Sequence, residues 1–183
     1  GGQKVETRLN ITVPENFYGA LENQENQKIR DELKKEIAMV EELLILEPRD
    51  KGSQYDSLKS SLETAKAKAS QALGSEDKTV LESALKEIKE KQSAFTQGCP
   101  KVLEMKKAKE DLQKSVEVAS SKKEADYEKD SFAPFAKALQ KAKAVLSQAK
   151  IMQKDLEEAI FDLDKTSKAL KTKGTSPSGG GGG

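Results

Sequence analysis

Two stretches of this chain place apolar residues at the same alternating intervals of four and three positions. This spacing gathers each set on one face of an α-helix, because one helical turn takes 3.6 residues. The surrounding letters also agree, with "LETAKAKASQA" in the first stretch and "LQKAKAVLSQA" in the second. The sequence therefore predicts one helix that occurs twice. The two apolar sets are Leu58, Leu62, Ala65, Ala69 and Ala72, and Phe135, Leu139, Ala142, Leu146 and Ala149.

Each repeated helix is flanked by two further stretches with helical apolar spacing, so each unit contains three helices. The chain is therefore predicted to be all-α, with two tandem three-helix bundles arranged end to end as a rod. A single longer bundle that mixes helices of both units is the alternative. The preceding helices carry Leu33, Ile37, Val40 and Leu44, and Met105, Ala108, Leu112 and Val116; the following helices carry Leu81, Leu85, Ile88 and Phe95, and Leu156, Ile160, Leu163 and Leu170.

Glycine and proline mark the ends of these helices. The stretch "EPRDKGSQ" separates the first two helices. Thr79, with Glu82 three residues later, matches a capping box at the start of the third helix. Gly98 and Pro100 separate the two units, and proline is favoured in the first turn of a helix.

Both ends of the chain differ from its helical middle. Residues 3–14 alternate apolar and polar side chains, which predicts a strand that is either the end of a preceding β-domain or a short arm lying on the helices. The tail "KGTSPSGGGGG" is typical of a flexible linker. The predicted parts are an N-terminal arm over 1–27, a first module over 28–98, a second module over 99–173 and a Gly/Ser linker over 174–183.

The stretch "YEKDSFAPFAKAL" concentrates aromatic residues in a chain with only 4% aromatic content. Phe135 begins the apolar face of its helix and is predicted to lie in the core. Asp130 or Ser131 is the predicted N-cap, which leaves Pro134 in or near the first turn, where a missing N–H costs least. Of these aromatics, Tyr127 is the one expected at the surface.

The second unit resembles a known module in "YEKDSFAPFAKALQKAKAVL" and "QKDLEEAIFDL", followed by Leu170. These stretches are similar to FIVAR (Found In Various Architectures), a three-helix module of large Gram-positive surface proteins and of secreted glycan-active enzymes. The first unit departs from the pattern, for example with Tyr55 in the place of Phe132. The resemblance implies an extracellular location, at the cell surface or in the cell wall, and a role in adhesion or as a stalk.

Composition excludes several classes of function. The 32 basic and 31 acidic side chains leave a net charge of +1, so no strong positive field favours nucleic acid. Histidine, the commonest metal ligand and neutral-pH base, is absent. The longest apolar cluster, "ELLILEP", is too short to cross a bilayer, which predicts no membrane insertion.

Several residues are candidates for chemical sites but are interpreted as structural. Cys99 has no histidine to activate it and is expected to be inert, although a helix N-terminus there would lower its pKa. The triplet that begins at Asn10 matches a glycosylation acceptor, but such triplets are common by chance. Three groups of acidic residues alternate with lysines and are interpreted as solvated helix faces. They are Glu41, Glu42 and Glu47; Asp126, Glu128 and Asp130; and Glu157, Glu158, Asp162 and Asp164.

Two features could serve a macromolecular partner. Residues 99–174 carry 17 basic and 13 acidic groups, whereas residues 29–98 carry 12 and 14. This bias is compatible with an acidic partner, such as a wall glycan. Phe161, which lies off the apolar face, and Ile151-Met152, in the predicted loop, are candidate protein contacts; for Phe161 we favour a position that covers the junction between modules.

The sequence as a whole predicts a protein that is not an enzyme, with no catalytic, metal or cofactor site. It would be a monomeric segment of a larger bacterial surface or secreted protein, acting as a stalk or spacer. A host or matrix protein is a possible adhesion partner, and no ligand-binding residue is identified. The alternative is an accessory module of a secreted glycan-active enzyme.

Overall fold

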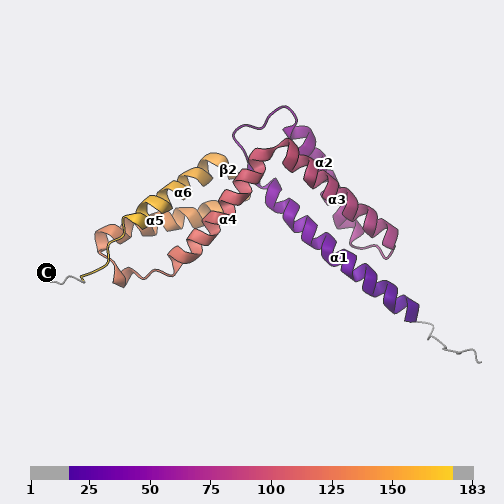
Figure 1. The fold of residues 1–183 in the computed structure, drawn as a ribbon, viewed down its shortest axis with the longest axis horizontal. Coiled ribbons are helices and arrows are strands. Elements are labelled where there is room, and N and C mark those ends of the chain that lie inside the picture. The colour runs from indigo at the N-terminus through magenta and orange to yellow at the C-terminus, as the bar shows by residue number, and fades with distance from the viewer. Residues whose placement is uncertain (1–16, 175–183) are drawn as a thin grey trace, which may run out of the picture.

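The computed structural model describes residues 17–174, and the predicted strand at 3–14 and the Asn10 triplet lie outside this range. Six α-helices, one short 3-10 helix and two very short strands follow one another along the described chain, and Figure 1 shows how they are arranged. The elements are α1 (Phe17–Leu44), β1 (Leu46–Glu47), α2 (Tyr55–Ala72), α3 (Lys78–Gly98), α4 (Pro100–Ser120), the 3-10 helix η1 (Glu124–Asp126), α5 (Lys129–Leu146), β2 (Ile151–Met152) and α6 (Gln153–Lys168).

The described residues confirm the all-α fold and form two three-helix bundles. Helices α1, α2 and α3 pack on one another, as do α4, α5 and α6. The rod predicted from the sequence is bent, because the two bundles diverge from a corner where β1, β2 and the α3–α4 connection meet (Figure 1). A bend is forced there because the backbone of Cys99 (φ −133°, ψ 67°) leaves the helical region between α3 and α4.

Helix α1 begins earlier than the sequence indicated. Residues 17–27, predicted to belong to an extended arm, form its first turns. The extra turns have a packing role, since Asn26 Nδ2 donates to the carbonyl of Glu76 at 2.7 Å. One turn further along, Arg30 Nη2 donates to the carbonyl of Ser75 at 2.8 Å. These bonds fasten α1 to the turn that connects α2 with α3.

The core of the first bundle follows the predicted apolar faces. Helix α2 turns its small residues inward, and every predicted position except the half-buried Leu58 is buried. Alanines on this face let α3 approach closely, and Leu81, Ile88 and Phe95 of α3 are fully buried at intervals of seven residues. Tyr55 closes the end of the core, where its ring lies 5.7 Å from that of Phe95.

The core of the second bundle differs from its prediction at one end. Phe135 and Ala142 are fully buried and Leu139 nearly so, as predicted. Ala149, however, lies beyond the end of α5 and is exposed. The helix ends at Leu146 because the backbone of Ser147 (φ −97°, ψ 2°) leaves the α-helical region, so the buried face finishes at Val145 instead.

The N-cap of α3 is Asp77, so the predicted capping box at Thr79 and Glu82 is wrong. Asp77 adopts an extended backbone, and its Oδ1 accepts a hydrogen bond from the Thr79 amide at 2.9 Å. Thr79 is therefore the residue whose amide is capped, at the second position of a helix that begins at Lys78. An Asp at this position also suits the positive end of the helix dipole.

Helix α5 also begins before the predicted cap. It starts at Lys129 with Glu128 as the N-cap residue, so neither Asp130 nor Ser131 has that role. Ser131 Oγ donates to the Glu128 carbonyl and accepts a hydrogen bond from the amide of Lys171, which ties the helix start to the C-terminal end of the bundle. Pro134 consequently lies inside the helix, beyond its first turn.

The aromatic residues of this region form one stack that closes the far end of the second bundle. Phe132 lies between Tyr127 and Phe135, with ring centroids 5.8 Å and 5.3 Å away. Tyr127 is half-buried and bridges to Thr172, so it is less of a surface residue than predicted. The stack is a structural anchor.

The fold predicts a large difference between two phenylalanines of the second bundle. Phe135→Ala removes a fully buried ring and should lower the free energy of unfolding by about 3–5 kcal/mol. Phe161→Ala removes a ring that is 64% exposed and should change it by about 0.5 kcal/mol or less. Urea denaturation measures both, and equal effects would contradict the assignment of the core.

Candidate functional sites: the junction between the bundles and the α4–α6 groove

The covalent link between the bundles is one residue long. Cys99 lies between the last residue of α3 and the first of α4, and its amide donates to the carbonyl of Phe95 at 2.8 Å. Pro100 occupies the first position of α4, as predicted. A backbone N–H at this position has no acceptor within the helix, so its absence in proline costs no helical hydrogen bond. Gly98 permits a close contact, since a Cβ there would lie 2.3 Å from Cδ1 of Leu58. The link therefore has little freedom.

A second backbone connection joins the bundles through segments that are far apart in sequence. Strands β1 and β2 pair in parallel, with Leu46 opposite Ile151 and Glu47 opposite Met152. The amide of Ile151 donates to the carbonyl of Ile45 at 2.7 Å. Leu46 and Ile151 are both fully buried. The predicted loop residue Ile151 is thus a core residue of the junction, whereas Met152 is exposed.

The cores of the two bundles meet at this point. Leu46 and Tyr55 from the first bundle and Val102 and Ile151 from the second belong to one continuous cluster of buried side chains. The Tyr55 hydroxyl lies 3.4 Å from the carbonyl of Leu46. Burial, together with the nearby Glu47 charge, raises the pKa of Tyr55 to about 12, so this hydroxyl stays protonated.

Glu47 is a nearly buried carboxylate, 8% exposed, at the centre of three lysines. Its oxygens lie 3.1 Å from Lys51 Nζ, 3.4 Å from Lys59 Nζ and 3.5 Å from Lys150 Nζ. Burial alone raises the pKa of Glu47, but the hydrogen bond and charge of Lys51 and the charge of Lys59 outweigh it and hold the pKa below its ordinary value. Because Lys150 precedes β2, this cluster also joins the bundles.

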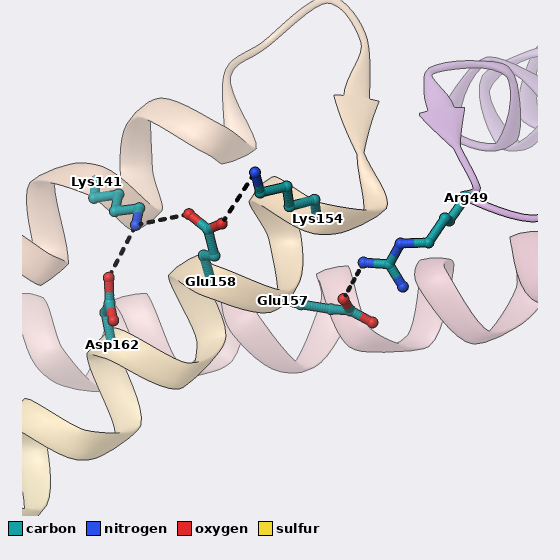
Figure 2. Close-up of polar contacts among 6 residues, drawn as sticks. All are labelled: Arg49, Lys141, Lys154, Glu157, Glu158 and Asp162. Atoms are coloured by element: carbon teal, nitrogen blue, oxygen red, sulfur yellow. Dashed lines mark hydrogen bonds and ion pairs between the residues drawn. The ribbon is translucent and has the colours of Figure 1, made fainter.

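Arg49 makes the outermost contact across the junction. Figure 2 shows its guanidinium reaching Glu157 on α6, with 2.8 Å between Nη2 and Oε1. Its backbone amide donates to Oε1 of Gln153, also at 2.8 Å. Hydrogen bonds from Arg49 and Gln153 lower the pKa of Glu157. One residue of the first bundle thus holds the first turn of α6 by both its main chain and its side chain.

Two further acidic residues of α6, Glu158 and Asp162, pair with a lysine of α5. Lys141 of α5 lies 2.9 Å from Asp162 and 3.4 Å from Glu158, and Lys154 also reaches Glu158 (Figure 2). These are surface ion pairs, which stabilise weakly. Asp164 pairs with Lys168 along the same helix.

A groove of about 800 Å³ runs between α4 and α6. Leu112, Ala119, Ile160 and Leu163 contribute apolar surface to it, and the two exposed apolar residues on its rims are Val118, 62% exposed, and Phe161, 64% exposed. The prediction that Phe161 covers the junction between the modules is therefore wrong. Phe161 lies on the outer surface of the second bundle. The junction is closed instead by residues of β1, β2 and α4.

The predicted chemical candidates are separated from one another. Cys99 is buried at the junction, and burial raises its pKa, opposite to the lowering expected from a helix N-terminus. Glu41 and Glu42 are exposed as predicted, but Glu47 is not part of a solvated face. Within residues 17–174 no three His, Cys, Asp or Glu side chains gather as a metal-binding group, and no helix there combines the length and apolar character needed to cross a bilayer.

Comparison of the chain with protein-family models, curated proteins and solved structures gives no significant match.

The junction should be sensitive to the loss of Glu47. Glu47→Ala leaves Lys59 partly buried without its partner and should lower the free energy of unfolding by about 1–3 kcal/mol. Glu41→Ala is the matched control, because it removes an exposed pair with Lys66 and should cost about 1 kcal/mol or less.

The same contacts predict an acid dependence. The pKa values of Glu47 and Glu157 lie below the ordinary value of 4.5 in the folded chain, so the stabilisation they give is complete above that pH and lost as the pH falls through the lowered values. Urea melts from pH 7 to acid should therefore show a smaller acid loss in Glu47→Ala than in the parent chain. An identical loss in both would contradict the role of Glu47.

Proposed function

We propose that the chain is a non-catalytic helical spacer that holds its two bundles at a fixed angle within a larger surface or secreted protein. The single observation that carries this proposal is the junction, where the one-residue α3–α4 link, the β1–β2 pair and the Arg49 contacts act together. A hinged pair of domains would instead meet through a small, polar interface and a flexible linker.

An extracellular location belongs to this proposal and is supported by the resemblance of the second unit to FIVAR modules. A fixed angle suits a spacer because it sets both the distance and the direction between the parts that the spacer connects. The alternative, an accessory module of a glycan-active enzyme, would use the same rigidity to orient a catalytic domain. The remainder of the reading frame distinguishes the two, since only the second requires a catalytic domain.

The proposal predicts one fixed distance between the far ends of the two bundles. Spin labels can be attached to cysteines introduced at the exposed positions Asn23 on α1 and Ser120 on α4, in a Cys99→Ala background. Double electron–electron resonance should then give a single narrow distance distribution. Arg49→Ala should broaden this distribution slightly, because it removes an exposed ion pair with Glu157 that stabilises the junction weakly.

Lys66→Ala is the matched control for this measurement, since Lys66 pairs with Glu41 inside the first bundle. It should leave the distribution narrow. A distribution that is already broad in the parent chain would refute the rigid spacer, whatever the chain binds.

A further inference from the structure

The first and the last helix of the described chain meet at the junction. Helix α1 runs from Phe17, at the far end of the first bundle, to the corner, and α6 runs from the corner to the far end of the second bundle (Figure 1). Only Ile45 separates α1 from β1, and α6 begins directly after β2. The β1–β2 pair therefore joins α1 to α6 almost end to end, although these helices are far apart in sequence.

Several contacts join residues 45–49 to residues 150–157, and we call these two segments together the clamp. The amide of Ile151 donates to the carbonyl of Ile45 at 2.7 Å. Arg49 binds the start of α6 twice, with its amide and with its guanidinium, at 2.8 Å in both cases (Figure 2). The clamp thus combines backbone and side-chain bonds between the same two parts of the chain.

The direction of the strands decides how a pull on the two ends of the chain acts on the clamp. Strand β1 is attached to α1 at its N-terminal end, and β2 is attached to α6 at its C-terminal end. Because the strands are parallel, tension draws them in opposite directions along their length. Hydrogen bonds between strands run across the strand direction, so this pull loads the contacts of the clamp together instead of one after another.

Burial and charge oppose the sliding of one strand past the other. Leu46 and Ile151 lie opposite each other and are fully buried. A slip of one residue in the direction of the pull would turn Leu46 away from the core and set Glu47 opposite Ile151. Exposing an apolar side chain and placing a carboxylate in an apolar site both cost free energy. In the observed register Glu47 instead lies 3.5 Å from Lys150.

The path through the clamp bypasses the middle of the chain. Arg49 and Gln153 are 104 positions apart, and helices α2, α3, α4 and α5 lie between them. The other path leads from α1 to α3 by side-chain packing, through the link at Cys99, and from α4 to α6 by packing again. The clamp is the shorter path, because it joins the two terminal helices directly.

We propose that the clamp carries mechanical tension between the two ends of the chain, so that forced unfolding begins when β1 slides past β2. While the clamp holds, the four helices between its two segments are spared the load and both bundles stay folded. This inference deepens the spacer role and rests on it in one respect, since the tension comes from the parts that a spacer connects.

The test pulls single molecules of the whole chain at a constant force, with handles at its two ends, and records how long each molecule stays folded. The double variant Arg49→Ala/Gln153→Ala removes the two contacts that Arg49 makes with α6. These contacts are broken at the barrier to sliding, so the stability that they give should appear in full as lifetime under force. The variant should unfold about fivefold sooner than the parent chain, as expected for the loss of about one hydrogen bond.

Ala67→Gly is the matched control, because Ala67 is an exposed residue of α2 outside the clamp. Glycine in the middle of a helix lowers stability by about as much as the loss of one hydrogen bond. Since α2 remains packed while the clamp opens, this variant should keep the lifetime of the parent chain to within about twofold. Urea melts without force measure the loss of stability with which each lifetime is compared.

An unchanged lifetime in the double variant would overturn the clamp, and so would an equal shortening in Ala67→Gly. The spacer is judged separately, because the spin-label distances are measured without force. A broad distance distribution refutes the fixed angle, whereas an unchanged lifetime of the double variant refutes only the clamp.

Discussion

The hydrogen bond from the Ile151 amide to the Ile45 carbonyl is the constraint on which the arrangement of the two bundles depends. It brings together segments about one hundred residues apart and aligns Leu46 with Ile151, so that the two cores become continuous. It is a second backbone connection between the bundles, beside the short link at Cys99. Because both side chains are fully buried, the pairing is stabilised by apolar burial as well as by the backbone bond.

The polar contacts of the junction follow from this pairing. Once β1 lies beside β2, Lys150 is brought to Glu47, and Arg49 to the first turn of α6. Burying a charged carboxylate costs free energy unless the carboxylate is paired. The pairing of β1 with β2, which buries Glu47, therefore requires the lysines around it. The bend in Figure 1 lies at the same junction, where the backbone of Cys99 leaves the helical region between α3 and α4.

Much of the fold could be predicted from the sequence, because helical periodicity reports burial directly. Leu62, Ile88 and Phe135 were placed correctly for this reason. The junction was missed because its residues lie in predicted loops, where no periodicity exists. One signal in the sequence could have indicated the junction: Leu46, two residues before Pro48, and Ile151 are apolar residues that belong to the apolar face of no predicted helix. The groove was missed because it depends on how far α4 and α6 separate, which Phe161 alone does not indicate.

Coupling of the two bundles is tested most directly by residue-resolved unfolding. Backbone amide resonances of Leu62 in α2 and Leu139 in α5 report on the two cores separately during a urea titration. A continuous core predicts coincident midpoints and one slope for both amides. Two separate midpoints, with one bundle folded while the other is unfolded, would contradict the account.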